Sequence, residues 1–209
     1  MKYLLFLFYI YNIYSKSLIL YFSRPNENYI VGNINIGNTQ VIAEYIKFYT
    51  NAEILKIEPE NNYPISYPET LKIAKKELDE NQRPNYLKKR NINQNYLNEF
   101  DTIYLGFPQW YEHLPRVFLN FLESFKFENK IVYPFTTHEG SRLSNTTLDE
   151  IKKIFKKSEI KDGLDIFGHS VPNSQKKVKN WLGKKVTVNE NETPKNRQTK
   201  IKKKKMNYN

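Results

Sequence analysis

The chain has 209 residues, of which 39% are hydrophobic, so it can form one well-packed core but is short for two full domains. It contains no cysteine, which excludes disulfides, thiolate nucleophiles and thiolate-bound metal centres. The formal net charge is +11, yet residues 184–209 carry +7 of it, and the remainder is too small and scattered to indicate a nucleic-acid-binding surface.

Residues 1–15 form an apolar N-terminal segment that contains the run YLLFLFYIYNIY. The run is too short to cross a bilayer as a helix, which needs about 20 residues, but it suits the hydrophobic part of a signal peptide cleaved before Lys16. An extra apolar strand and an unused upstream start codon are the alternatives. If the segment is cleaved we expect export to the periplasm or cell envelope, and otherwise a cytoplasmic protein.

From Lys16 onward, short apolar runs alternate with segments of helical periodicity, which is the pattern of repeated βα units. This pattern predicts an α/β fold with a doubly wound parallel sheet and helices on both faces. The predicted strands are residues 16–22, 53–58, 101–107, 130–135 and a fifth around 162–168. The first predicted helix begins near Asn38. Four further helices are predicted at about residues 70–80, 115–125, 144–157 and 173–183.

The first segment suited to binding a ligand is the polar loop 23–37 after the first strand, together with the Gly37-Asn38-Thr39 triplet that opens the first helix. Free amide groups and the dipole at a helix N-terminus favour a phosphate. The alternative is that Asn38 or Thr39 simply caps the helix. No GxxxxGK[ST] motif is present, so a nucleoside-triphosphate loop is excluded.

The second segment is GFPQWYEHLP at residues 106–115, where a strand ends and a loop presents Trp110 and Tyr111. Large aromatic side chains at a ligand-binding edge are suited to stacking on a planar heterocycle. Ordinary core or surface aromatics are an equally good interpretation of this segment taken alone.

The third segment is PFTTHEGSRLSN at residues 134–145, whose main-chain amides could reach a polar cofactor edge near Gly140. A hydrolytic triad is disfavoured, because His138 and Ser141 are close in sequence and no GxSxG motif is present. A histidine metal site is also disfavoured, because His113, His138 and His169 occur singly.

Residues 184–209 are rich in Lys and Asn and lack an apolar face, which predicts a basic disordered tail. Contact with acidic membranes or RNA is the alternative to a solvated tail. The chain is therefore divided into the segment 1–15, a folded domain at 16–183 and the tail at 184–209.

Taken together and in this order, the stretches YFSR with ENYIVGNINIGNT, GFPQWYEHLP and PFTTHEGS resemble the flavodoxin superfamily, in its long-phosphate-loop branch of anaerobic bacteria. The resemblance covers about residues 16–183. It implies a flavodoxin-like three-layer sandwich with five parallel strands in the order 2-1-3-4-5. It also implies non-covalent FMN as the cofactor and a role as an electron carrier or a related oxidoreductase.

Carried over by position, the resemblance implies three groups of cofactor-binding residues and no catalytic residue or metal ligand. The phosphate group would be surrounded by Ser23, Arg24, Gly37, Asn38 and Thr39. One wall of the isoalloxazine site would be formed by Pro108, Gln109, Trp110 and Tyr111, and the other by Thr137, His138, Glu139, Gly140 and Ser141.

The chain departs from typical flavodoxins in three ways. The loop after the first strand is longer, so that residues 25–36 could cover the flavin or shape a substrate pocket. Glu112 stands where glycine usually follows the aromatic pair, which makes a peptide flip near the flavin costlier and would lower the flavin potential if the carboxylate lies close. The net charge is basic, whereas typical flavodoxins are acidic around the flavin edge.

These observations favour an FMN-binding electron-transfer protein whose partners are redox proteins or NAD(P)H, with no nucleic acid partner and no integral membrane span. The first alternative is an FMN-dependent NAD(P)H oxidoreductase acting on quinones or similar acceptors. The second is a flavin-free scaffold that binds a partner through its basic tail.

Overall fold

The computed structural model describes residues 16–183. The predictions of a signal peptide or extra strand at residues 1–15 and of a basic disordered tail at 184–209 lie outside the described residues.

A parallel sheet runs through the middle of the molecule. Its strands are β1 (Ser17–Phe22), β4 (Glu53–Ile57), β5 (Thr102–Pro108), β6 (Ile131–His138), β7 (Glu159–Ile160) and β8 (Leu164–Phe167). They lie in the order β4-β1-β5-β6, and both β7 and β8 pair with β6 on its far side. Counted by βα unit, this is the predicted order 2-1-3-4-5 of a flavodoxin-like sandwich, which is therefore confirmed.

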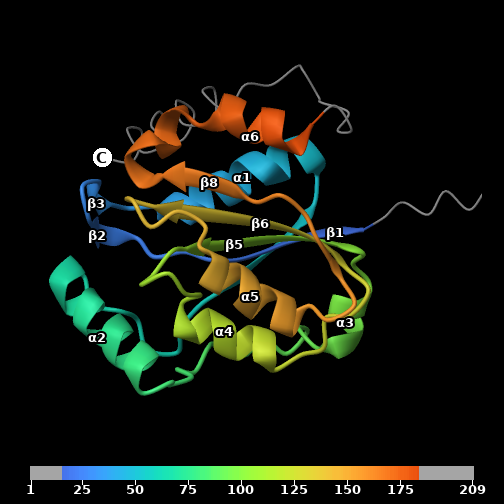
Figure 1. The fold of residues 1–209 in the computed structure, drawn as a ribbon, viewed down its shortest axis with the longest axis horizontal. Coiled ribbons are helices and arrows are strands. Elements are labelled where there is room, and N and C mark those ends of the chain that lie inside the picture. The colour runs from blue at the N-terminus through green and yellow to red at the C-terminus, as the bar shows by residue number, and fades with distance from the viewer. Residues whose placement is uncertain (1–15, 184–209) are drawn as a thin grey trace, which may run out of the picture.

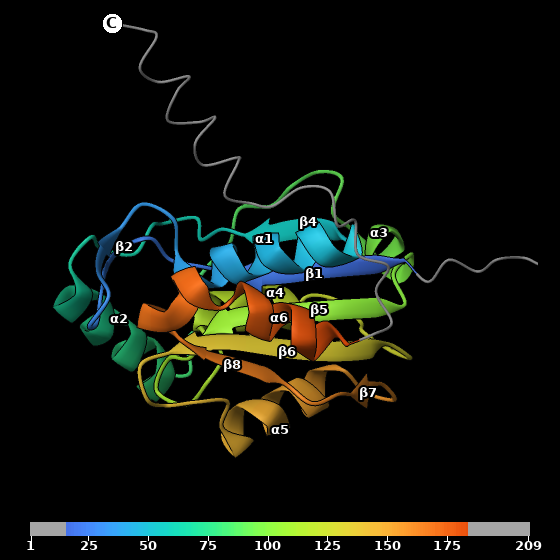
Figure 2. The ribbon, with the colours of Figure 1, turned by 90° about the horizontal axis from the view of Figure 1, so that it is seen from above.

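Helices cover both faces of the sheet (Figures 1 and 2). One face carries α1 (Asn38–Thr50) and α6 (Gln175–Leu182), and the other carries α4 (Arg116–Glu123), α5 (Asn145–Ile154) and the short α3 (Gln94–Asn98). A 3₁₀ helix, η1 (Gly168–Asn173), joins β8 to α6. The resulting three layers leave the carboxyl ends of the strands open at one edge.

Two apolar cores fill the spaces between the layers, one on each face of the sheet. On the α1 and α6 side, Ile19, Ile42 and Ile46 are among the fully buried side chains. On the α4 and α5 side, nine phenylalanines and leucines from β1, β5 and α4 are almost wholly buried. The central strands are thus buried on both faces, which explains why their sequences read as continuous apolar runs.

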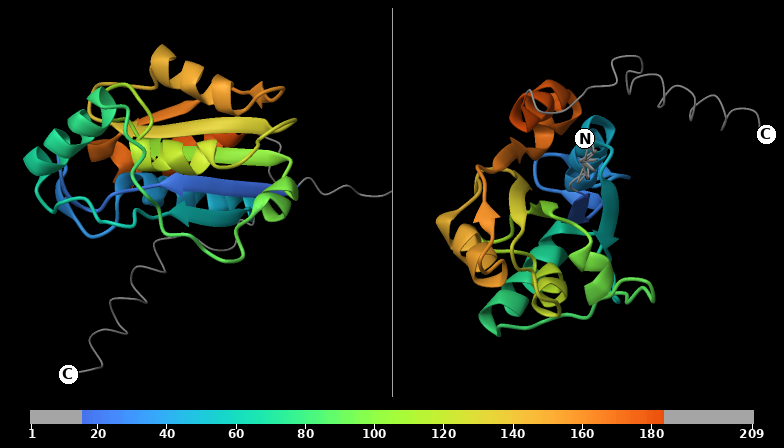
Figure 3. Two further views of the ribbon diagram at one scale, coloured as in Figure 1. Left: turned by 90° about the horizontal axis from the view of Figure 1, so that it is seen from below. Right: turned by 90° about the vertical axis from the view of Figure 1, so that its right-hand side faces the viewer.

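The long loop after β1 contains a small antiparallel hairpin of β2 (Asn26–Asn28) and β3 (Gly32–Ile34). Next to it lies α2 (Tyr67–Asp79), which stands beyond the carboxyl ends of the strands in Figures 1 and 2 and in the left panel of Figure 3. The loop and α2 therefore flank the open edge of the sheet.

The predicted elements are present, with differences at their ends and in number. β6 runs three residues beyond the predicted end at 135, because Thr136, Thr137 and His138 continue the pairing with β5 and β8. The predicted fifth strand corresponds to β8, which pairs only with the end of β6, while a separate short strand, β7, pairs with the start of β6. The hairpin, α3, β7 and η1 had no counterpart among the predicted elements.

Within residues 16–183, no helix is both long enough and apolar enough to span a lipid bilayer.

Candidate functional site

A cavity of about 320 Å³ opens at the carboxyl ends of β1, β5 and β6. In a doubly wound sheet this edge is where ligands bind, at the point where the strand order reverses. Twelve of the fourteen residues predicted to bind a cofactor line it: Ser23, Arg24, Asn38, Thr39, Pro108, Gln109, Trp110, Tyr111, Thr137, His138, Glu139 and Ser141. The other two, Gly37 and Gly140, are their chain neighbours.

The first helix begins beside this cavity without a side-chain cap. Gly37 is the N-cap residue, and neither Asn38 nor Thr39 caps the helix: Thr39 Oγ1 instead lies 2.8 Å from Thr137 Oγ1. The alternative of a simple capping role is therefore wrong. The hydroxyl of Ser23 accepts a hydrogen bond of 3.1 Å from the Gln40 amide. Ser23 thus occupies the Gln40 amide, and the helix dipole and the amides before Gln40 are the features of this helix start that favour an anion.

Gly37 is required by close packing. A Cβ at this position would lie 2.3 Å from Ser23 Oγ and 2.5 Å from the Arg24 carbonyl oxygen. Its φ of −63° is open to any residue, so the requirement is for space and not for an unusual backbone conformation. The loop after β1 and the start of α1 can meet this closely only because position 37 has no side chain.

Arg24 connects this end of the cavity to the turn before α2. Its Nη atoms donate hydrogen bonds to the carbonyl oxygens of Glu27, Pro64 and Ile65, and the guanidinium is buried, which lowers its pKa. The buried Nε has no hydrogen-bond partner among the described residues. Arg24 thus holds the hairpin to the turn at 64–66.

The aromatic wall of the cavity is a tight turn. Trp110 and His113 exchange main-chain hydrogen bonds, and the two residues between them, Tyr111 and Glu112, have φ values of 50° and 63°. Both therefore adopt the left-handed conformation of a type I′ turn, which non-glycine residues rarely occupy. The Tyr111 hydroxyl donates to the Leu71 carbonyl oxygen at 3.3 Å, which links the turn to α2.

Gln109, just before this turn, has its amide orientation fixed by hydroxyl groups. Its Nε2 lies 2.6 Å from Thr147 Oγ1 and 3.3 Å from Ser144 Oγ, while both hydroxyls donate to the Glu112 carbonyl oxygen at 2.8 Å. Since the hydroxyl protons point to Glu112, Gln109 donates with Nε2 and its Oε1 is left as a buried acceptor without a partner. Gln109 is itself among the residues that line the cavity.

His138 lies on the opposite wall as a neutral imidazole. The Gly140 amide donates to its Nδ1 at 3.0 Å, so the proton is on Nε2, which donates to Asp165 at 3.1 Å. Burial is the main cause of its lowered pKa, and Asp165 acts in the opposite direction. The Gly140 amide is thus already used within the protein.

Glu139 binds the start of η1 with both carboxylate oxygens. Oε1 accepts from the His169 amide and Oε2 pairs with His169 Nδ1, each at 2.7 Å. Gly168, which precedes His169 in the chain, is tightly enclosed, since a Cβ there would approach Glu139 Oε1 at 2.8 Å and Asn38 Nδ2 at 2.5 Å. The segment after β8 thereby closes one side of the cavity.

A second side of the cavity was predicted only in part: residues 25–36 were expected to cover the site or shape a pocket, but α2 was not. It is formed by the hairpin and α2, with Asn28, Tyr29, Val31, Tyr67, Thr70, Leu71 and Ala74. Tyr29 and Tyr67 stack with ring centroids 5.7 Å apart, and the Tyr67 amide donates to the Glu27 carboxylate. For the α2 part of this wall, the Pro- and Tyr-rich composition of residues 59–68 was the only sequence signal.

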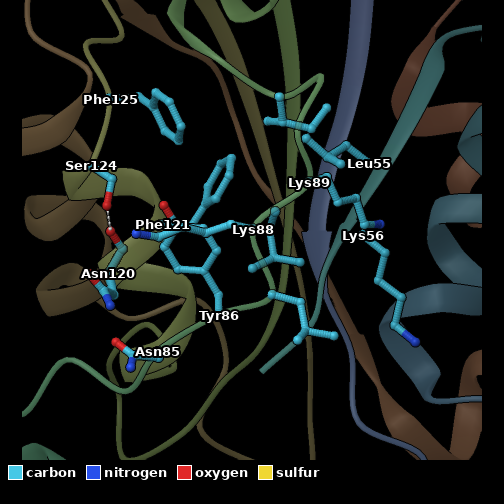
Figure 4. Close-up of a pocket in the computed structure, with 13 residues that line it drawn as sticks. Leu55, Lys56, Asn85, Tyr86, Lys88, Lys89, Asn120, Phe121, Ser124 and Phe125 are labelled. Atoms are coloured by element: carbon cyan, nitrogen blue, oxygen red, sulfur yellow. Dashed lines mark hydrogen bonds between the residues drawn. The ribbon is translucent and has the colours of Figure 1, made fainter. Parts of the chain in front are cut away.

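A separate hollow of about 440 Å³ lies between β4, residues 85–92 and the end of α4 (Figure 4). Leu55, Tyr86, Phe121 and Phe125 supply apolar and aromatic surface, with Lys56, Lys88 and Lys89 also among its lining residues. None of its lining residues comes from the three segments that the sequence indicated as suited to binding a ligand. The cavity at the carboxyl ends of the strands is therefore the candidate functional site.

The sheet order, the uncapped helix start and the aromatic turn together define a flavodoxin-like α/β protein. A family model described as flavodoxin matches residues 29–185, and the chain belongs to that family.

Solved structures agree with this assignment. A candidate flavoprotein from Bacteroides uniformis is 26% identical, with a TM-score of 0.64 over 81% of this chain and 99% of the other. A second, from Bacteroides eggerthii, is 23% identical, with a TM-score of 0.62 over 80% and 96%. A Lactobacillus acidophilus flavoprotein in complex with FMN is 20% identical, with a TM-score of 0.53 over 78% and 99%. No curated protein matches the chain.

Proposed function

We propose that this protein binds FMN non-covalently at the cavity and transfers electrons through it. The observation that carries the proposal is the cavity at the strand ends, which joins an uncapped helix N-terminus at one end to an aromatic turn at the other. Two buried polar atoms, Arg24 Nε and Gln109 Oε1, remain there without protein partners, as expected for groups that serve a ligand. The residues present therefore fit the cofactor of the related flavoprotein.

In this arrangement each part of the chain has a defined task. The first turn of α1, with Ser23 and Asn38, would hold the phosphate, and Arg24 would offer its remaining donor. Trp110 and Tyr111 would flank the isoalloxazine on one side, with Thr137 to Ser141 on the other. Bound FMN supplies the redox chemistry, and the surrounding protein orients it, limits water and tunes its potential.

A flavin titration tests this proposal. Full-length protein freed of bound flavin is titrated with FMN and, in parallel, with riboflavin, which lacks the phosphate. We expect one FMN per chain and clearly weaker riboflavin binding, because the helix N-terminus recognises an anion. Absence of FMN uptake contradicts the proposal, and equal affinity for both flavins contradicts the phosphate assignment.

The second candidate function is an FMN-dependent NAD(P)H oxidoreductase acting on quinones or similar acceptors. The observation that favours it is the extra wall of the hairpin and α2, which adds Tyr29 and Tyr67 to the residues that line the cavity, alongside Tyr111 of the aromatic turn. Such tyrosines offer stacking surface for a planar acceptor. Steady NAD(P)H oxidation in the presence of a quinone supports this function, whereas one-electron reduction without turnover supports a carrier.

Two further predictions concern the whole chain. A colourless protein that takes up no FMN would support the flavin-free scaffold. Export remains a prediction, and N-terminal sequencing of the protein isolated from its own cell would test cleavage before Lys16.

A further inference from the structure

Trp110 is in contact with an oxidisable side chain, Tyr63, that is not among the residues lining the cavity. Its ring centroid lies 4.9 Å from that of Tyr63 in an edge-on arrangement, and Phe22 contacts both rings at 5.6 and 6.1 Å. Both side chains pack against the apolar core on the α4 and α5 side, and of the two only Trp110 also lines the cavity. The pair therefore leads from the wall of the site into the protein.

The Tyr63 hydroxyl has a carboxylate as its hydrogen-bond partner. It donates to Glu77 Oε2 at 2.9 Å, and Glu77, on α2, is only 5% exposed. Burial raises the pKa of Glu77, although Tyr63 and Arg116 oppose the shift, and burial raises the pKa of Tyr63 as well. A buried carboxylate with a raised pKa is a better proton acceptor than a solvated one.

A phenol is hard to oxidise unless its proton can leave at the same time, because the phenol radical cation is a very strong acid. A carboxylate within hydrogen-bond distance offers that proton a destination without any atom moving far. Trp110, Tyr63 and Glu77 supply an electron acceptor at the site, an electron donor beside it and a proton acceptor behind it.

We propose that Trp110, Tyr63 and Glu77 form a relay that removes an oxidising equivalent from the wall of the site. When a one-electron oxidant converts Trp110 to its radical cation, Tyr63 gives one electron to Trp110 and its phenolic proton to Glu77. The products are neutral Trp110, a neutral Tyr63 radical and a protonated Glu77 carboxyl, so charge and atoms balance. The relay requires no bound flavin, so it stands or falls independently of the proposed function.

The relay can be followed in the full-length protein by pulse radiolysis with azide radical, a one-electron oxidant of tryptophan. The chain has two tryptophans, and W181F leaves Trp110 as the single tryptophan, the type of side chain that azide radical oxidises fastest. In this background we expect the indole radical to decay as a tyrosyl radical rises at the same rate, independently of protein concentration. The rate should also be lower in heavy water, because a proton moves.

Two substitutions separate the parts of the relay. Y63F removes the donor, and E77Q keeps a hydrogen-bond acceptor but cannot take the proton. Each is expected to slow conversion by about tenfold or more, equivalent to about 1.4 kcal/mol in the barrier. The matched control is Y96F, because the Tyr96 hydroxyl also donates to a carboxylate, Glu53 at 3.3 Å, but its ring packs on Phe100. Y96F should leave the rate unchanged.

The outcomes are distinct. An unchanged rate in Y63F overturns the relay. If Y63F slows the conversion of the indole radical but neither E77Q nor heavy water changes its rate, Glu77 is not the proton acceptor. Circular dichroism and thermal unfolding check that each variant is folded, and the heavy-water measurement tests the proton step with Tyr63 and Glu77 intact.

Discussion

The side-chain nitrogen of Gln109 donates to Thr147 Oγ1 at 2.6 Å, and this bond determines which end of the Gln109 amide remains free at the site. Thr147 can accept because its own proton is given to the Glu112 carbonyl oxygen. One hydroxyl on α5 thus orients an acceptor, Gln109 Oε1, and also holds the aromatic turn. The site depends on a helix that contributes no residue to the lining of the cavity.

The first prediction concerns this free oxygen. In Q109L the acceptor is lost while the side chain keeps a similar size, so an N–H group of bound FMN would lose its partner. We expect FMN affinity to fall by about 1–2 kcal/mol, or about 5- to 30-fold, measured by flavin fluorescence titration. Q82L, at a partly exposed position outside the cavity, is the control, and equal affinities in Q109L and the parent protein would contradict the assignment.

The second prediction concerns the contact between the loop after β1 and the start of α1. In G37A the new methyl group would press against Ser23 Oγ and the Arg24 main chain. We expect the free energy of unfolding to fall by about 1–3 kcal/mol and the FMN affinity to fall by about tenfold or more.

The matched control for this change is G163A. Its methyl group would also lie too close to a neighbour, at 2.2 Å from a Leu143 methyl, but away from the cavity. It should lower stability without lowering FMN affinity. If both variants lose affinity equally, the effect of G37A is on overall stability and not on the phosphate site.

Much of the candidate site follows from the sequence because the strands are parallel. Ser23, Pro108 and Thr137 each lie at or just past the end of an apolar run, and parallel strands bring their carboxyl ends to one edge. To predict that the three segments meet, it is therefore enough to know the strands and their order. No particular side-chain contact has to be known.

The contributions of Arg24 and α2 could not be obtained in this way. Arg24 donates to carbonyl oxygens some 40 residues further along the chain, in a turn with no periodic pattern. The helical spacing of Leu71, Ala74 and Leu78 predicts a helix but does not say that it stands beyond the strand ends. The extra wall arises from such long-range contacts, including the Tyr29–Tyr67 stack.

The third prediction concerns the left-handed turn at Tyr111 and Glu112. Glycine adopts this conformation without the strain of about 1–2 kcal/mol that a Cβ causes, although it loses about 0.5–1 kcal/mol through the greater freedom of the unfolded chain. We therefore expect E112G to raise the free energy of unfolding by about 0.5–1 kcal/mol, measured by urea denaturation. E112A keeps the Cβ and removes the carboxylate, and it should change stability little. An equal gain in E112A would show that charge, and not backbone strain, is responsible.

The fourth prediction is the pH dependence that arises from His138. Because burial lowers its pKa in the folded protein below the ordinary value of 6.5, the unfolded chain binds more protons as the pH falls below that value. The contribution of His138 to stability is therefore complete above pH 6.5 and is lost as the pH falls through the pKa of the folded state. H138Q can still donate to Asp165 but cannot titrate, so its stability should decline less between about pH 7 and about pH 5. Urea denaturation across this range measures the difference, with H169Q as the control because the His169 side chain is about half exposed. If the curves of H138Q and the parent protein run parallel, His138 does not cause the loss.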